Sequence, residues 1–453
     1  MDSKPMLKNA RIEAIILFLG DLLSLFAGLW LALFIRYYAA PELINFETHL
    51  LAFFPVFLFS FLVWFISGLY QKSTLLPAEG VSSILLNAQA VNAIFSAAFF
   101  YLVPVPGIAP KTILFFYIVL STLFMFLWRY SLSGLFFAEK PVKAILVASE
   151  NIRQEFESAL KEHGVKNILI LAFVNPEAPD FQRSFAGALK DNPRSKVIAD
   201  CSHPIFSSVC LDLAPDLADR GLIDVVRLYE VIFDRVPLFD LGTGKLLEDA
   251  IVAESVWYAF GKRILDFIIS LPLAVVFLIL LPFVILAIKL ESRGDVFITQ
   301  ERMGRFKKPI KVYKLRTMNF MEDSHWLGEN GSNKVTSVGR VLRRLSIDEM
   351  PQMWNILRGE LSFIGPRSDI SGLAKRLSEN IPGYDIRYAV TPGITGWAQI
   401  NQQYSPGNIS PQSIEETKIR LAYDLFYIKR RSLGLDLVIA LKTLRILLSR
   451  AGL

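Results

Sequence analysis

Two adjacent acids, Asp348 and Glu349, are the residues whose type and position most suggest chemistry. They stand in the stretch LSIDEMPQMWNIL, where Ser346 and Glu349 have the S-x-x-E spacing of a capping box before an apolar run. The pattern predicts a helix that starts here, with Asp348 in its first turn and Pro351 close enough to the start to be tolerated. In a purely structural interpretation, the acids only complement the positive end of the helix dipole.

The same position also suits catalysis. A helix N-terminus keeps a carboxylate ionised and attracts phosphate, and an ionised aspartate such as Asp348 can attack phosphorus. Glu349 can help to hold Mg²⁺, which prefers one or two carboxylates together with phosphate oxygens. Because neighbouring helical residues diverge by about 100°, the two acids would have separate roles. Spacing alone leaves both interpretations open.

Arginines flank the acidic pair on both sides. Phosphoryl transfer needs cations that spread the charge on the phosphate oxygens. The candidates are Arg316 in YKLRTM, Arg343 and Arg344 directly before the acids, and Arg367 in SFIGPRS. Gly365 and Pro366 predict a tight turn that would direct Arg367. Each arginine taken alone could equally be a surface charge.

The elements that must position these residues belong to a membrane protein. The chain has 453 residues, 53% of them hydrophobic, and its mean hydropathy is +0.41, which is too apolar for an ordinary soluble protein. A net charge of +6 favours anionic lipids and phosphorylated substrates as partners over nucleic acid. Cys201 and Cys210 form no CxxC pair and the four histidines are scattered, so neither a disulfide framework nor a zinc site is predicted.

Four apolar runs open the chain, each near or above the ~20 residues needed to cross a bilayer. They cover about 12–38, 50–70, 82–104 and 112–136, and no signal-peptide cleavage site follows the first. We therefore expect a four-helix transmembrane bundle in residues 1–140. Both of its ends should face the cytoplasm, because basic residues cluster before the first run and after the last: Lys4, Lys8, Arg11, Arg129, Lys140 and Lys143.

Residues 141–250 have a different pattern, typical of a small Rossmann-like α/β domain with a parallel sheet. KAILVAS, NILILAFV and SKVIADCS are short strand-like runs, and NIRQEFESALKEHG has helical spacing that ends at Gly164. A dinucleotide-binding domain would carry GxGxxG after the first strand, but the sequence there is VASENI. A structural or regulatory role is therefore favoured over nucleotide binding.

A fifth apolar run, Phe267 to Ile288, contains Pro272 and Pro282. Its length permits an ordinary transmembrane helix, but a fifth crossing would place everything after it outside the cell, away from nucleotide substrates. Proline can bend a helix, and basic residues lie on both sides: Lys262, Arg263, Lys289 and Arg293. We predict a re-entrant membrane hairpin over 264–290, bent at Pro282 and with Lys262 and Arg263 at the membrane interface, within a mainly α-helical monotopic catalytic domain at 251–453.

The C-terminal stretch from Lys418 to Arg450 is basic, and LGLDLVIALKTLRILL is an apolar stripe with cations at its edges. That composition is typical of a helix in the membrane interface. A buried core helix with a solvated basic face fits the same letters.

These stretches together resemble the bacterial polyprenyl-phosphate sugar-1-phosphate transferases with a monotopic catalytic core. The matching motifs follow one another in order through the last part of the chain: KRILDF (262–267), QERMGR (300–305), VYKLRTM (312–318), LRRLSIDEMPQMWNILRGELSFIGPR (342–367), VTPGITGWAQIN (390–401) and YDLFYIKRRSLGLDLVI (423–439). No single motif is specific, but the ordered set is. With four spans and a middle α/β domain in front, the chain resembles the long-form members that initiate exopolysaccharide, capsule or O-antigen assembly.

The resemblance implies a two-step reaction. Asp348 would be the nucleophile that takes the sugar-phosphate from a UDP-sugar and releases UMP, and undecaprenyl phosphate would then attack this intermediate. Glu349, with Asp348, would hold Mg²⁺. Candidate phosphate- and substrate-binding residues are Arg316, Arg343, Arg367, Gln300 and Arg302. The resemblance also implies a bacterial inner membrane location with the catalytic domain facing the cytoplasm, and a homodimer.

Three departures from the family pattern stand out. The family's Pro-Arg-Pro is Pro366-Arg367-Ser368 here, the Ser-Pro of the hairpin is Leu281-Pro282, and Gln402 stands where glycine often follows GWAQIN.

Two other classes of protein compete with this interpretation. Membrane dehydratases of nucleotide sugars need a glycine-rich loop, against which VASENI argues. A scaffold protein would use the acids only as a helix cap.

Overall fold

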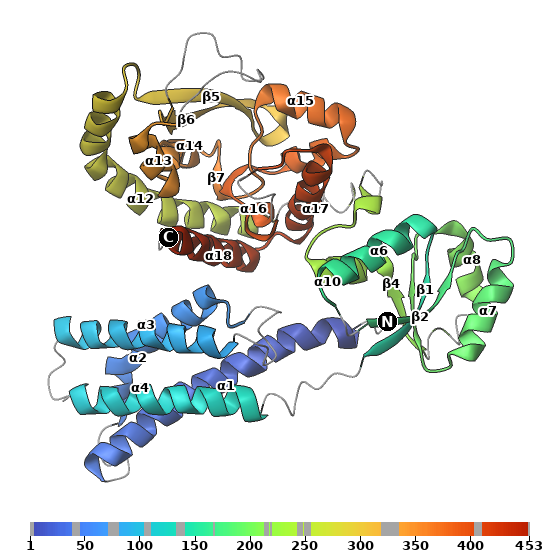
Figure 1. Cartoon of the computed structure of the whole chain (residues 1–453), viewed down its shortest axis with the longest axis horizontal. Helices are drawn as coiled ribbons and strands as arrows, with labels where there is room; N and C mark the ends of the chain where they lie inside the picture. Colours follow the sequence, from blue (N-terminus) through green and yellow to red (C-terminus); the bar gives the residue numbers. More distant parts are fainter. Residues whose placement is uncertain are drawn as a thin grey trace.

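The computed structural model describes residues 4–38, 46–70, 81–103, 110–132, 141–165, 168–212, 217, 220–241, 248, 255–318, 335–402 and 410–451. Figure 1 shows three parts in chain order: a bundle of helices (blue to cyan), a small sheet domain (green) and a C-terminal domain (yellow to red). Five described helices are long and apolar enough to cross a membrane, four in the bundle and one that opens the C-terminal domain. This is the composition of a membrane protein, as expected.

The bundle confirms the four predicted helices. They are α1 (Lys4–Tyr37), α2 (Phe46–Ser67), α3 (Val81–Leu102) and α4 (Pro110–Leu127), and the last continues into a π-helical turn, η3 (Trp128–Leu132). Their buried side chains are large and apolar, among them Leu29, Phe53, Trp64 and Leu85. The opposite faces expose residues such as Leu51 and Ile94, which suits contact with lipid tails.

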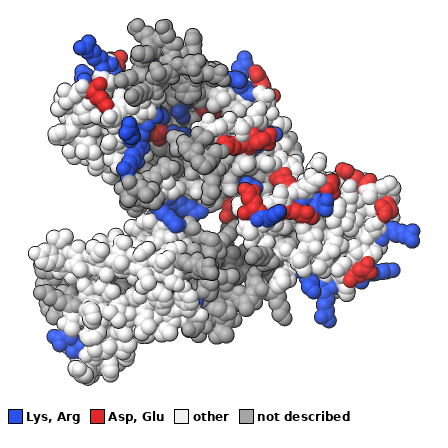
Figure 2. Space-filling model, in the orientation of Figure 1, with Lys and Arg blue, Asp and Glu red and all other residues white. Residues whose placement is uncertain are grey.

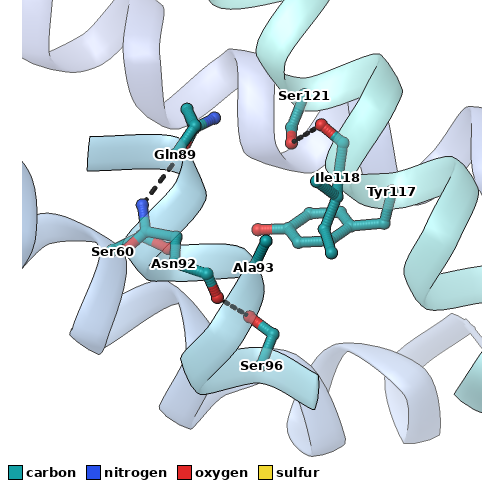
Figure 3. Close-up of a pocket in the computed structure, with 8 residues that line it drawn as sticks. All are labelled: Ser60, Gln89, Asn92, Ala93, Ser96, Tyr117, Ile118 and Ser121. Carbon is teal, nitrogen blue, oxygen red and sulfur yellow. Dashed lines mark hydrogen bonds between the residues drawn. The ribbon is translucent and has the colours of Figure 1, made fainter. Parts of the chain in front are cut away.

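Polar side chains of the bundle are turned inward and bonded to one another. Asp21, which interrupts the first apolar run, accepts two hydrogen bonds from Arg129, at 3.1 and 2.5 Å, and one from Tyr70 at 2.8 Å. Figure 3 shows a second polar cluster around a small cavity lined by α2, α3 and α4, where the Asn92 side chain donates to Gln89 at 2.9 Å. Buried pairing of this kind makes polar residues tolerable within a membrane.

The sheet domain has four parallel strands in the order β2-β1-β3-β4. They are β1 (Val142–Val147), β2 (Ile168–Val174), β3 (Lys196–Ala199) and β4 (Leu222–Asp224). Helices α6 (Glu150–Glu162) and α10 (Val225–Phe233) pack on one face, and α7 (Phe181–Asp191) and α8 (Pro204–Asp212) on the other. Side chains alternate along β1: Ala144 and Leu146 enter one core, Ile145 and Val147 the other. The predicted parallel sheet is confirmed.

The C-terminal domain contains two small sheets and many short helices. The sheets are an antiparallel hairpin, β5 (Phe297–Met303) with β6 (Pro309–Leu315), and a parallel pair, β7 (Ser362–Ile364) with β8 (Gly393–Thr395). The helices are α12 (Val256–Glu291), η5 (Arg305–Lys307), α13 (Ser337–Arg344), η6 (Ile347–Gln352), α14 (Met353–Arg358), α15 (Ser371–Asn380), η7 (Tyr384–Ala389), α16 (Trp397–Asn401), α17 (Ile414–Arg430) and α18 (Leu433–Ala451).

Helix α12 differs from the hairpin predicted over 264–290. It is one continuous helix that contains both Pro272 and Pro282, so the chain is not divided into two helices at Pro282. Each proline removes only one backbone donor, and the neighbouring turns hold the helix together. Figure 1 shows that α12 changes direction along its path from α18 toward β5. Re-entry into the membrane stays a prediction.

One face of α12 packs on the C-terminal domain, through Phe277 and Ile288, while the other exposes Leu278, Ile279 and Phe283. Helix α18 is likewise two-sided: Ile439 and Asp436 are fully buried, whereas Leu437 is half exposed. The core interpretation of the C-terminal stretch is therefore confirmed for one face, and its contact with a membrane stays a prediction.

The sheet domain docks on α17. Glu230 of α10 is buried and accepts hydrogen bonds from Lys429, at 2.8 Å, and from Arg430, at 3.0 Å. Beyond α10, Val236 enters the core of the C-terminal domain beside Leu421 and Leu425.

Candidate active site

Three polar side chains of the candidate site project from one face of the β5–β6 hairpin. Residues directly opposite in an antiparallel pair share a face, as do alternate residues of one strand. Gln300 pairs with Val312, and Lys314 with Ile298, so Gln300, Arg302 and Lys314 lie on the same side. Arg302 donates to Gln300 Oε1, at 2.9 and 3.2 Å, and to the Ser368 carbonyl, at 2.8 Å.

The two acids lie in the first turn of η6, opposite this hairpin. The helix start is where the sequence predicts it, but it is a short 3₁₀ helix, and α14 begins only at Met353. The predicted capping box is wrong. Ser346 adopts a left-handed conformation (φ +56°) and its side chain makes no capping bond. The Glu349 side chain does not return to the helix start but reaches outward to two cations.

Glu349 is bonded by one cation from each side. Its Oε1 accepts from Lys314 Nζ at 3.1 Å and from Arg367 Nη2 at 2.6 Å. Burial alone would raise the pKa of Glu349, but the charges and hydrogen bonds of Arg367 and Lys314 outweigh it and lower the pKa to about 2. Glu349 is therefore ionised at any physiological pH.

Asp348 has the opposite electrostatic environment. Burial and, second, the negative charge of Glu349 raise the pKa of Asp348 to about 6, against the opposing effect of Lys314 and Arg343. A carboxylate with this pKa is mostly ionised at neutral pH yet less stabilised than its neighbour. Such a difference between two adjacent acids is typical of catalytic pairs.

Arg367 comes from the turn between β7 and α15. A Cβ atom on Gly365 would lie 2.7 Å from the Thr391 carbonyl, so only glycine lets β7 approach β8 this closely. The second proline of the family's Pro-Arg-Pro is absent, but hydrogen bonds hold the turn: Arg387 donates to the Arg367 carbonyl at 2.8 Å, and Arg302 donates to the Ser368 carbonyl. Figure 2 shows Lys and Arg side chains gathered around a hollow in the C-terminal domain.

Known proteins with similar sequences place this site in a family. The family model described as bacterial sugar transferase matches residues 257–450, the part that contains every residue of the site. A glucose-1-phosphate transferase that acts on UDP-glucose and undecaprenyl phosphate, from Caulobacter vibrioides, is 40% identical over 190 residues, which are 42% of this chain and 70% of that protein. The chain belongs to the bacterial sugar transferase family.

Two further relatives differ in length. An exopolysaccharide production protein of Rhizobium leguminosarum is 36% identical over 188 residues, 40% of this chain and 92% of that protein. An undecaprenyl-phosphate N-acetylgalactosaminephosphotransferase of Aeromonas hydrophila, which uses UDP-N-acetylgalactosamine, is 34% identical over 238 residues, or 52% of this chain. The chain spans about half (54%) of the length of that protein.

Not every predicted site residue of this sugar transferase lies at Glu349. The Arg316 guanidinium is buried and donates to the carbonyls of Ser292, at 2.8 Å, and Arg293, at 2.9 Å, where α12 ends. Arg343 is exposed and donates to Thr317 at 2.8 Å, within electrostatic reach of Asp348. Arg316 therefore has a structural place, whereas Arg343 borders the acids.

Lys262 and Arg263, predicted at the membrane interface, are bonded into the domain. Lys262 donates to the Ile364 carbonyl at 2.8 Å and pairs with buried Asp436 at 3.1 Å. Arg263 donates to the last carbonyls of α14, including that of Leu357 at 2.6 Å. These contacts connect the start of α12 to α14, which follows the acids of η6, and to β7, which precedes the turn that carries Arg367.

The sequence analysis missed Lys314 and the ion network behind Arg367. In that network Arg387 and Arg420 both pair with Asp369, and Arg387 also pairs with Asp424 at 2.8 Å. Lys314 lies in VYKLRTM, two residues after Val312. This spacing could have indicated that its side chain is on the same face of the hairpin as Val312 and Gln300. For the network no local signal exists, because its members come from distant segments.

A divalent cation fits the two acids only together with substrate. No group of three or more His, Cys, Asp or Glu side chains that could hold a metal occurs within the described ranges. Mg²⁺, however, needs only one or two carboxylates when phosphate oxygens and water supply the rest. Both cation contacts of Glu349 use Oε1, which leaves its Oε2 and the Asp348 carboxylate as the candidate ligands.

Proposed function

We propose that this protein transfers a sugar-1-phosphate from a UDP-sugar to undecaprenyl phosphate and releases UMP, as the first step of exopolysaccharide, capsule or O-antigen assembly. One observation carries the proposal. An acid with a raised pKa, Asp348, lies beside an acid that Lys314 and Arg367 keep ionised. The names of the relatives from Aeromonas hydrophila and Caulobacter vibrioides give the same class of donor and acceptor.

In the first step, a carboxylate oxygen of Asp348 attacks the phosphorus that carries the sugar. A bond forms between that oxygen and phosphorus, and the bond from phosphorus to the bridging oxygen of the diphosphate breaks. The bridging oxygen leaves with its electron pair as part of UMP. The guanidinium of Arg367 and the ammonium of Lys314 would spread the charge that develops on the phosphate oxygens.

In the second step, a phosphate oxygen of undecaprenyl phosphate attacks the same phosphorus. The bond between Asp348 and phosphorus breaks, the carboxylate is restored, and the product is a sugar linked to the lipid through a diphosphate. No proton has to move in either step, so the site needs a nucleophile and cations but no general base. This agrees with the absence of histidine from the motifs that form the site.

Mg²⁺ is the proposed metal, with Asp348 and Glu349 Oε2 as its protein ligands and the phosphates of the substrate as the others. Bound there, it would neutralise charge on the diphosphate and the leaving UMP. Arg367 and Lys314 hold Glu349 Oε1 in place, which fixes the direction in which Oε2 points.

The acceptor is a membrane lipid, so the site should lie at the membrane surface, on the cytoplasmic side where nucleotide sugars are made. Both ends of α12 support this. Its first turns bond to α14 and β7, and Glu291 near its end accepts from the backbone of Ser337 and Val338 in α13, at 2.5 and 2.8 Å. A straight helix of this length would span about 54 Å, yet both ends meet one domain. We infer that α12 enters and leaves the bilayer on one face.

The test is UMP release by the purified full chain in lipid, with Mg²⁺, undecaprenyl phosphate and a panel of UDP-sugars. The Asp348→Asn variant is the comparison, because asparagine preserves size and hydrogen bonding but cannot act as an anionic nucleophile. Release with one sugar, reduced at least about 10³-fold in the variant, supports the proposal and names the donor.

Two other results would change the conclusion. Release that persists in Asp348→Asn would exclude Asp348 as the nucleophile. No release from folded protein with any UDP-sugar would favour a scaffold role, in which the acids only begin η6. The expected homodimer stays a prediction.

A further inference from the structure

A small cavity lies next to Arg367, which is one of its lining residues. Arg367, Gln399 and Ala398 line it from the β7–β8 region and α16, Arg420 and Asp424 line it from α17, and Ser410 closes it. Neither Asp348 nor Glu349 lines this cavity. The reaction proposed above uses Arg367 and leaves the rest of the cavity without a role.

Gln399 places an unsatisfied acceptor here. Its Nε2 donates to the Ile394 carbonyl at 2.9 Å. Because a carbonyl can only accept, this bond fixes which end of the amide is nitrogen and which is oxygen. The remaining atom, Oε1, is buried and has no hydrogen-bond partner among the described residues. A buried acceptor without a partner destabilises the site, so a ligand that supplies a hydrogen-bond donor there binds more tightly.

Gln399 and Arg367 are connected through one atom. The Ile394 carbonyl that accepts from Gln399 also accepts from Arg367 Nη1, at 3.4 Å, while Arg367 Nη2 bonds to Glu349. A substrate whose phosphate lies on Arg367 therefore has its neighbouring groups close to Gln399. The Gln399 oxygen itself is uncharged, although Asp424 and Arg420 also line the cavity, so it suits a neutral N–H or O–H donor rather than a second phosphate.

We propose that Gln399 Oε1 accepts a hydrogen bond from a neutral donor group of the UDP-sugar, and that Gln399 thereby contributes to selection of the donor substrate. This rests on the proposed function. Two groups of the substrate have the required chemistry: the imide N–H of uracil and a hydroxyl of the transferred sugar. Cytosine has an acceptor where uracil has its imide N–H, so the first of these would also separate UDP-sugars from CDP-sugars.

Gln399→Leu is the variant that removes the acceptor at similar size, and Gln402→Leu is its matched control. Gln402 has the same arrangement, with Nε2 donating to the Glu416 carbonyl at 2.8 Å and Oε1 buried and unpartnered within the part of the chain that the structure describes, but it does not line the cavity. We expect the KM for UDP-sugar to rise about tenfold in Gln399→Leu, the loss of one neutral hydrogen bond, with kcat within about threefold of the unmodified chain. The control should leave both constants unchanged.

UMP and CMP binding to the unmodified full chain, measured by calorimetry, distinguishes the two sources and does not depend on catalysis. Tighter binding of UMP than of CMP, with the difference lost in Gln399→Leu, supports the imide N–H. A sugar hydroxyl is supported if three results occur together. UMP and CMP bind equally, Gln399→Leu leaves both affinities unchanged, and the same variant raises the KM for UDP-sugar. An unchanged KM and unchanged UMP binding in Gln399→Leu would overturn the proposal. If UMP binds but no UDP-sugar reacts, the proposed function fails while the role of Gln399 can still be measured.

Discussion

Asp348 and Glu349 are adjacent in the chain but differ in what surrounds them. Glu349 faces Lys314 and Arg367, which lower its pKa, whereas Asp348 is subject to burial and to the charge of Glu349, both of which raise its pKa. Glu349 is thus held permanently ionised, whereas Asp348, the proposed nucleophile, would be able to attack only after it loses a proton near pH 6. The division of roles that the sequence suggested follows from these partners rather than from the helix dipole.

A pH profile tests this difference. In single-turnover UMP release without undecaprenyl phosphate, the rate should rise as pH increases through about 6, because Asp348 must be ionised to attack. Lys314 favours the ionised form of Asp348, so Lys314→Met should shift this rise to higher pH. Lys311→Met is the control, since Lys311 is exposed on the same strand. A profile that is flat between pH 5 and pH 8, or a shift to lower pH in Lys314→Met, would contradict the assignment.

The structure brings Asp348, Glu349 and Arg367 of the motifs together, but the motifs could not say which neighbouring cations reach the acids. Arg316 and Lys314 are two residues apart in one motif. Lys314 is still on β6, whereas Arg316 lies just past its end and donates to the carbonyls of Ser292 and Arg293, which directly follow α12. Alternation along a strand predicts direction only within the strand, so the sequence favoured the wrong member of the pair.

Among the elements, α12 controls where the acids lie. Its last turn packs in one apolar cluster with Leu315 of β6, Leu342 of α13 and Ile347 of η6, and Arg316 bonds to the carbonyls that follow α12. The two prolines indicated a break, but a single missing donor bends a helix without dividing it. The bend therefore follows from the sequence, whereas the continuity of the helix depends on its packing against the domain.

Arg316 should consequently contribute to stability rather than to substrate binding. Arg316→Met leaves two carbonyls without their donors, and we expect it to destabilise the fold by about 1–3 kcal/mol, measured by thermal unfolding in detergent. Arg340→Met, at an exposed position of α13, should change little. At temperatures where the variant stays folded, the KM for UDP-sugar should be unchanged. A raised KM with unchanged stability would show instead that Arg316 binds phosphate.

At the scale of the whole molecule, the three parts were each predictable from hydropathy and strand patterns, but their connection was not. Glu230 is an ordinary acid within a helical stretch, and only the structure shows it buried between Lys429 and Arg430 of α17. The same helix carries Arg420 and Asp424, which line the cavity beside Arg367. The sheet domain thus docks on the helix that forms one wall of that cavity.

Glu230→Gln tests this docking. It preserves size but removes the charge that pairs with two cations, and breaking a buried pair is costly. We expect faster hydrogen exchange in α10 and in residues 234–241 of the variant, while Glu157→Gln, on the exposed face of α6, leaves exchange there unchanged. Equal exchange in both variants would mean that apolar contacts such as those of Val236 are sufficient to hold the sheet domain.

In the proposed reaction, Asp348 carries the sugar-phosphate between the two substrates. The most direct test is the intact mass of the full chain after incubation with Mg²⁺ and the reactive UDP-sugar, in the absence of undecaprenyl phosphate. The account predicts an added mass equal to one sugar-phosphate, located on the peptide that contains Asp348, lost when undecaprenyl phosphate is added and never formed in Asp348→Asn. UMP release only when both substrates are present, with no added mass at any time, would contradict it and indicate direct transfer from donor to lipid.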